Sequence, residues 1–94
     1  MTKHPNYVVG YEGSLEQLAK EVGNMSYDQV AKFLYALSID LENQGKADKK
    51  RGRKELSREL LGASTHIKIA GTRIDLAWKI CEPYMSKKDE EGRK

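Results

Sequence analysis

Apolar residues between Leu56 and Cys81 recur at alternating steps of four and three positions. The stripe consists of Leu56, Leu60, Ala63, Ile67, Ala70, Ile74, Ala77 and Cys81. This spacing predicts an amphipathic helix that buries one side against a partner. The stripe is flanked by further apolar residues, namely Ile69, Leu76, Ile80 and Trp78. The apolar side then covers roughly 200° of the circumference, about twice what a surface helix needs, so we expect more than one neighbour to cover it.

The sequence leaves open whether this run forms one helix or two. Gly62 followed by Ser64 or Thr65 could end one helix and cap the next. Against a break, the four-three register continues through Gly62 without a slip of phase. We therefore predict one continuous helix that ends near Glu82, because Pro83 disfavours helical backbone at the residue before it.

A short helix is predicted after an N-terminal arm. Residues 1–13 have no helical period, which is typical of a flexible arm. Ser14 and Gln17 have the spacing of a capping box, in which each side chain binds the backbone N–H of the other. The apolar side that follows consists of Leu15, Leu18, Ala19 and Val22. Gly23 is placed to end this helix.

A second helix repeats the same start signal. Ser26 and Gln29 have the capping-box spacing, and Gly45 is placed to end the helix. Its apolar stripe consists of Val30, Phe33, Leu34, Leu37 and Leu41. Because only a few residues separate the two helices, we expect them to form a sharply turned pair.

Basic residues are concentrated just before the long run. Residues 46–58 contain seven Lys or Arg and two acidic residues, a net charge of +5, whereas the whole chain has a net charge of +3. The candidates for contact with an anion or a nucleic acid are Lys46, Lys49, Lys50, Arg51, Arg53 and Lys54. Cations at this density can neutralise phosphates, although no aromatic residue accompanies them to stack on bases.

Residues 46–54 fit either a loop or the first turns of the long helix. We favour a helix that starts near Ala47, because Lys, Arg and Ala promote helices and only a tight connection after Gly45 is then needed. A helix over residues 47–82 would be roughly 50 Å long, against less than about 30 Å for residues 26–44. The apolar part of the long helix would project beyond the second helix, which predicts a second subunit as its cover.

We predict a homodimer that forms through the C-terminal part of the long run. The self-association residues are Ile67, Ala70, Ile74, Ala77, Trp78 and Cys81. Arg73 lies at the edge of the apolar arc, where a charge needs a partner. We expect Arg73 to form an ion pair that fixes the register of the assembly.

The composition fits a single all-α domain. The chain has 94 residues, of which 38% are hydrophobic, and its β-branched residues do not alternate along the sequence. We assign residues 1–13 to the arm, residues 14–85 to the helical domain, and residues 86–94, which are mixed in charge, to a disordered tail. The predicted fold is a small helical bundle of one short, one medium and one long helix, completed by dimerisation.

The sequence predicts a cytoplasmic protein without a membrane segment. It contains no apolar run long enough to cross a bilayer and no charged-then-apolar leader. Its single cysteine, Cys81, cannot form an intramolecular disulfide. A cysteine in an apolar stripe is typical of a small buried side chain in a reducing compartment.

The first two predicted helices resemble the helix-turn-helix of bacterial regulators. Residues 18–23 followed by Ser26 and Val30 are similar to that motif, which implies DNA binding through residues 15–35. Val30 lies one position later than in the motif, and the reading face would present Asp28 and no Arg. Nucleic-acid association, through this pair or the basic run, is the alternative function.

No pattern typical of catalysis, metal binding or cofactor binding is present. His4 lies in the arm, and Ser64 and Thr65 would not face His66 on a helix. Cys81 and His66 are fifteen residues apart and lack the companions that a metal site needs. We therefore predict a non-enzymatic protein-interaction module, an adaptor or regulatory subunit, which self-associates and binds an unidentified protein without a cofactor.

Overall fold

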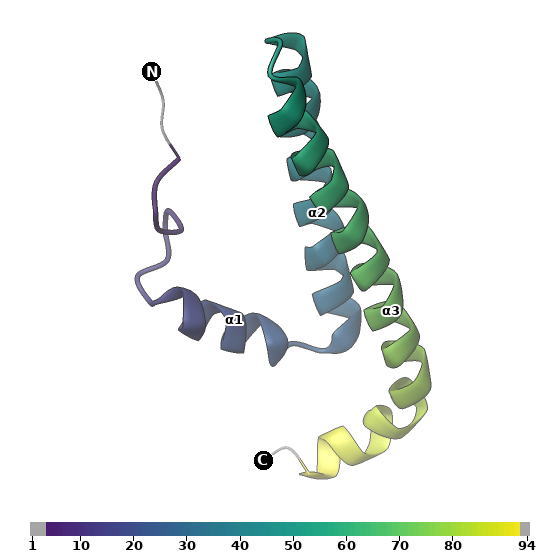
Figure 1. The fold of residues 1–94 in the computed structure, drawn as a ribbon. Coiled ribbons are helices and arrows are strands. Elements are labelled where there is room, and N and C mark those ends of the chain that lie inside the picture. Colours follow the sequence, from purple (N-terminus) through teal and green to yellow (C-terminus); the bar gives the residue numbers. More distant parts are fainter. Residues whose placement is uncertain (1–3, 93–94) are drawn as a thin grey trace.

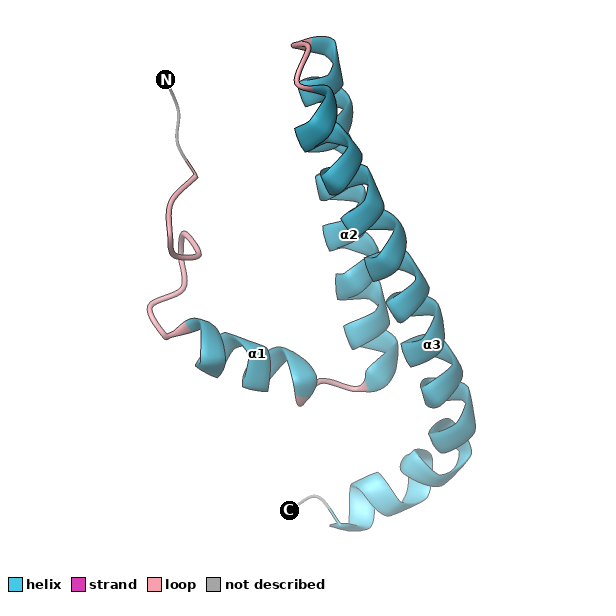
Figure 2. Cartoon of the chain, in the orientation of Figure 1, coloured by secondary structure: helices cyan, strands magenta, loops and turns pink. Residues whose placement is uncertain are grey.

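The computed structural model describes the backbone of residues 4–92 and the side chains of residues 4–84. Its elements are α1 (Leu15–Gly23), α2 (Tyr27–Lys50) and α3 (Lys54–Gly92). Helices α2 and α3 pack as an antiparallel hairpin, and α1 lies across the start of α2 (Figures 1 and 2). The predicted all-α class, with one short, one medium and one long helix, is confirmed.

Helix α1 begins at the predicted capping box. The Ser14 hydroxyl accepts the backbone N–H of Gln17 at 3.1 Å, and the Gln17 side-chain oxygen accepts the backbone N–H of Ser14 at 2.8 Å. The helix ends at Gly23, as the sequence predicts. Within the described residues α1 contacts α2 and not α3, so the three helices do not form a closed bundle.

The capping box predicted for α2 is not formed. Ser26 is the N-cap residue, but its hydroxyl donates to the carboxylate of Asp28 and accepts no backbone N–H of the first turn. The sequence-based prediction did not account for the carboxylate two residues on, which is a charged acceptor for the Ser26 hydroxyl. This hydrogen bond, with smaller contributions from Gln29, lowers the pKa of Asp28 below its ordinary value.

The prediction that Gly45 ends α2 is wrong, and so is the prediction that α3 starts near Ala47. Helix α2 continues to Lys50, and the chain turns over residues 51–53. The turn uses Gly52, whose φ of +85° lies in the left-handed region that favours glycine. Gly45 is instead a packing position, since a Cβ atom there would lie 2.9 Å from Cδ2 of Leu61.

Small residues form the line of contact between α2 and α3. They occur every seven positions on each helix and are all buried: Ala31, Ser38 and Gly45 on α2, and Ser57, Ser64 and Gly71 on α3. The register is set at the middle, where the Ser64 hydroxyl donates to the backbone oxygen of Ser38 at 2.6 Å. Small side chains let two helices approach closely, so larger side chains are displaced to the flanks of the contact.

Helix α3 is continuous through Gly62, as predicted, and it does not end near Glu82. It runs through Pro83 to Gly92, so the backbone of residues 86–92, which were assigned to the tail, continues α3. Residues 1–3 of the predicted arm and residues 93–94 of the predicted tail lie outside the described residues.

The alignment of α2 with α3 also shows that less of α3 projects beyond α2 than the sequence predicted. The ring of Tyr35 in α2 packs on Gly71, because a Cβ atom there would lie 2.8 Å from Tyr35 Cε1. Ile67 and Ile74 therefore lie alongside α2, and only the part of α3 beyond about residue 75 projects past the start of α2. The cause is the late turn of the chain: α2 is longer than predicted and α3 begins later.

One flank of the hairpin is polar. Glu42 of α2 forms ion pairs with Lys46 at 3.3 Å and with Lys68 of α3 at 3.7 Å. The Tyr35 hydroxyl lies 3.2 Å from the Thr72 hydroxyl, within hydrogen-bond distance. These contacts join the two helices along a solvated edge.

Candidate functional site

Apolar residues, most of them large, occupy the other flank of the hairpin. On α2 they follow the stripe Val30, Leu34, Leu37 and Leu41, and on α3 they follow Leu56, Leu60, Ala63, Ile67, Ala70, Ile74, Ala77 and Cys81. On each helix the stripe lies next to the contact line, displaced around the helix axis in the same rotational direction. Because the helices are antiparallel, this places both stripes on the same side of the hairpin. We call this surface the apolar face. Leu37 is 36% exposed and Leu56 is 46% exposed, so the chain does not cover this face.

The structure places the predicted self-association residues on or beside the apolar face. Ile67, Ile74, Ala77 and Cys81 are half-buried there, and Ala70 is exposed. Trp78 is half-buried one seven-residue step beyond Gly71, in the part of α3 that projects past the start of α2. The predicted residues thus share one surface, although only part of each side chain is covered.

Arg73 lies on the side of α3 that points away from α2. It is exposed, and within the described residues it forms no ion pair. Its role in fixing the register of an assembly stays a prediction. Inside the chain, the Ser64–Ser38 hydrogen bond has that role instead.

Helix α1 lies on the same side as the apolar face. A hollow of about 330 Å³ separates its apolar side from Phe33 and Leu34 of α2. Leu15 at the start of α1 is 61% exposed, and Phe33 is 43% exposed. Helix α1 therefore adds apolar surface beside the hairpin and does not close it.

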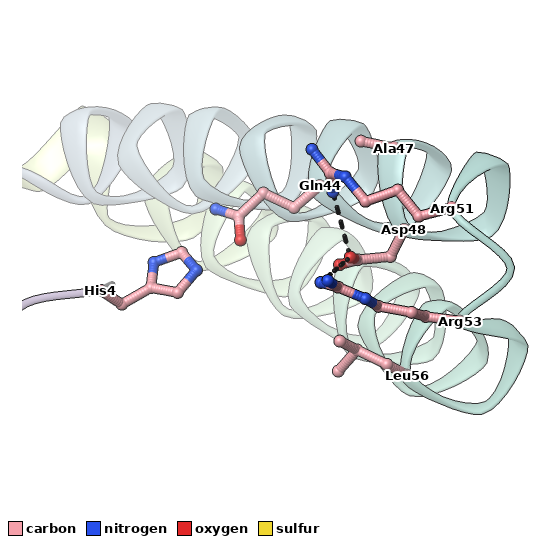
Figure 3. A pocket seen from close by; sticks show the side chains of 7 residues that line it. All are labelled: His4, Gln44, Ala47, Asp48, Arg51, Arg53 and Leu56. Carbon is pink, nitrogen blue, oxygen red and sulfur yellow. Dashed lines mark hydrogen bonds and ion pairs between the residues drawn. The ribbon is translucent and has the colours of Figure 1, made fainter. Parts of the chain in front are cut away.

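The hairpin tip holds the basic run of residues 46–58, and Asp48 neutralises part of the positive charge on one side of the tip. Asp48 accepts from the Arg51 guanidinium at 3.1 Å and from the Arg53 guanidinium at 3.2 Å (Figure 3). The Asp48 carboxylate is nearly buried between them, at 8% residue exposure. Across a hollow of about 580 Å³ from this group lies His4 of the arm. Arg51 and Arg53 thus have an acidic partner within the chain, as Lys46 has in Glu42.

A second hollow at the tip, of about 280 Å³, has a different lining. Lys49 of α2 and Lys54 and Arg58 of α3 surround it, together with Ser57 and Leu61. No carboxylate lines this hollow, and within the described residues none of the three cations forms an ion pair. The sequence named Lys49 and Lys54 as candidates and counted Arg58 in the basic run of residues 46–58, but it gave no reason to add the hydroxyl of Ser57.

The residues considered for catalysis are separated from one another. Ser64 is buried in the hairpin contact, whereas His66 is exposed on another side of α3. At the start of α2, Asp28 keeps a lowered pKa through Ser26, so the face proposed to read DNA carries an ionised carboxylate at neutral pH. The described part of the chain holds no group of three or more His, Cys, Asp or Glu placed to bind a metal.

Comparison with protein-family models, with curated proteins and with solved structures finds no match to this chain. Among the described residues, no helix has the length and apolar character needed to cross a membrane.

Proposed function

We propose that this chain is a non-enzymatic helical interaction module that works as a homodimer, an adaptor or regulatory subunit whose hairpins pair through the apolar face. The observation that carries this proposal is the size of the interior. Among the described residues the only buried hydrophobic side chain is Ala31, and the largest fully buried side chain is Ser38. Burial of large apolar side chains is the main favourable contribution to folding, and one copy of the chain leaves its large apolar side chains only partly buried.

The chain exposes more surface than a compact monomer of its mass, and the excess is about the area that each subunit would bury in a dimer. The chain exposes 7699 Å², whereas a compact monomer of 10.7 kDa exposes about 5,500 Å². The exposed arm accounts for part of the excess of about 2,200 Å². Obligate homodimers bury about 1,000–2,500 Å² per subunit, so pairing two copies is sufficient to restore a normal surface.

The shape of the chain agrees with this estimate. Its radius of gyration is 16.7 Å, against about 12 Å for a compact domain of this length. Two amphipathic hairpins that join their apolar faces make a four-helix bundle, in which all four stripes meet at the centre. A second copy is the simplest occupant because the cover is needed for folding itself, and another copy is present whenever the chain is made.

The test compares two substitutions on one helix. Leu37 lies on the apolar face and Ile39 lies outside it, and both are at least one-third exposed in the single chain. Leu37→Glu would bury a carboxylate in the dimer, so we expect at least a 100-fold weaker association. Ile39→Glu adds the same charge to the same helix and leaves association unchanged. Sedimentation equilibrium measures both, together with the melting temperature as a function of protein concentration.

The wild-type chain is expected to sediment as a dimer and to melt at a higher temperature when it is more concentrated. A folded wild-type monomer at millimolar concentration would overturn the proposal. Equal effects of Leu37→Glu and Ile39→Glu would also overturn it, because they would show that the apolar face is not the surface that associates. A one-to-one complex with a different protein that excludes a second copy would assign the face to that protein.

A further inference from the structure

We infer that the hollow formed by Lys49, Lys54 and Arg58 binds phosphate groups of a nucleic-acid duplex backbone. The three cations come from both helices of the hairpin, on the two sides of the turn at residues 51–53. Their convergence on one hollow of about 280 Å³ is a property of the fold and not of the basic composition alone. Of the other cations of the run, Lys46 pairs with Glu42, Arg51 and Arg53 pair with Asp48, and Lys50 is exposed and does not line the hollow.

A second, independent observation points to an anion. Ser57 is only 2% exposed and lines this hollow. The backbone N–H of Ser57 donates to the Arg53 carbonyl, but its hydroxyl has no hydrogen-bond partner within the described residues. No fully buried side-chain oxygen or nitrogen of the described residues lacks a partner, so the Ser57 hydroxyl still reaches solvent, and a phosphate oxygen in the hollow would accept from it. Ser57 also belongs to the first turn of α3, where the helix dipole favours negative charge.

The lining selects the backbone of a nucleic acid over its bases. No aromatic side chain and only one large apolar side chain, Leu61, lines the hollow, so a base would find no stacking surface. Lysine acts as a point charge toward phosphate, and the tip is the narrow end of a particle 54 Å long. A duplex presents phosphates at close, regular spacing along its surface, which suits several cations on a convex tip.

This site does not depend on the proposed dimer. All of its residues belong to one copy, and Lys54, Arg58 and Leu61 lie on the polar flank, away from the apolar face. Pairing through the apolar face leaves the site open. A loss of nucleic-acid binding without a change in association, or the reverse, therefore separates the two proposals.

The experiment measures binding of the full chain to a fluorescently labelled 20-base-pair DNA duplex by anisotropy, at several salt concentrations. Three phosphate contacts predict about a 40-fold loss of affinity between 50 and 200 mM salt, from a log–log slope of about −2.7. The triple variant K49Q/K54Q/R58Q is expected to lose at least tenfold at 50 mM salt and most of that slope. The matched control K20Q/K32Q/K79Q removes the same charge elsewhere and keeps at least two-thirds of the slope.

Ser57→Ala separates the hydroxyl from the charges. We expect it to weaken binding several-fold with an unchanged salt slope, since it removes a donor and no cation. Circular dichroism confirms that each variant remains folded. Absence of binding at 50 mM salt, or an equal loss in the K20Q/K32Q/K79Q control, would overturn the inference. Equally tight binding to polyglutamate would also overturn it and would assign the surface to an acidic protein.

Discussion

The Ser64 hydroxyl donates to the backbone oxygen of Ser38 at 2.6 Å, across the middle of the contact between α2 and α3. Both residues are buried, and the Ser38 hydroxyl in turn donates to the Tyr35 carbonyl at 2.7 Å within α2. The centre of the hairpin thus consists of two small polar residues whose hydroxyls are both satisfied. This arrangement aligns the helices but supplies little apolar burial.

Ser64→Ala is expected to destabilise the protein by about 1 kcal/mol, because it removes a buried hydrogen bond between the helices. Ser64→Leu should cost about 1–3 kcal/mol, since a larger side chain does not fit against Ser38. The control is Thr65→Ala, which removes an exposed hydroxyl that donates within α3 to Leu61. Urea unfolding at fixed protein concentration measures all three. A cost for Ser64→Ala no greater than that for Thr65→Ala would contradict the assigned role.

Two glycines of α3 are expected to respond in opposite directions to the same substitution. A Cβ atom on Gly71 would lie 2.8 Å from Cε1 of Tyr35, whose ring is held by the contact between its hydroxyl and Thr72. Gly71→Ala should therefore destabilise the hairpin by about 1–3 kcal/mol. At Gly62 a Cβ atom meets nothing, so Gly62→Ala should stabilise α3 by up to about 1 kcal/mol. Thermal unfolding that shifts both variants in the same direction would refute the register described for the hairpin.

Gly52 is expected to tolerate asparagine better than alanine. Its φ of +85° strains most L residues, and asparagine is among those that adopt this region most readily. Nothing lies within 4 Å of a Cβ atom there, so the effect comes from the backbone alone. Gly52→Ala should cost about 1 kcal/mol, and Gly52→Asn less, in the same unfolding measurement. An equal cost for both would show that the backbone conformation of the turn is not the cause.

The sequence predicted the helices better than their ends, and the glycines explain why. Gly23, Gly45 and Gly52 all carry the same local stop signal. Gly23 ends a helix, Gly52 forms the turn, and Gly45 lies inside a helix because Leu61 of the facing helix needs the space. That last reason is a contact between residues far apart in the chain, which no local pattern contains.

The apolar pattern found the right residues but did not show which side of α3 meets α2. Serine counts as polar in such a pattern, so the line through Ser57, Ser64 and Gly71 was not recognised as the contact. The stripe through Ile67 and Ile74 is instead the surface beside that contact. For the tip, the sequence supplied the cations, but their pairing with carboxylates depends on the position of the turn and could not be predicted.

Glu42 gives the stability of the hairpin a dependence on pH. The hydrogen bond from Lys46, followed by the charges of Lys46 and Lys68, lowers the pKa of Glu42 below its ordinary value of 4.5. The unfolded chain therefore binds a proton more readily than the folded chain. The stabilisation from Glu42 is complete above pH 4.5 and is lost as the pH falls through the lower folded value.

Urea unfolding of the wild-type chain and of Glu42→Gln between pH 7 and pH 3 checks this dependence. The wild type should be more stable than the variant at pH 7, and the difference should shrink below pH 4.5. It should also shrink at 1 M salt, because the ion pairs are exposed and are screened. Glu59→Gln is the control, since within the described residues Glu59 forms no ion pair, and it should follow the wild type across the range. A difference between wild type and Glu42→Gln that is constant from pH 7 to pH 3 would show that the Glu42 charge does not join the two helices.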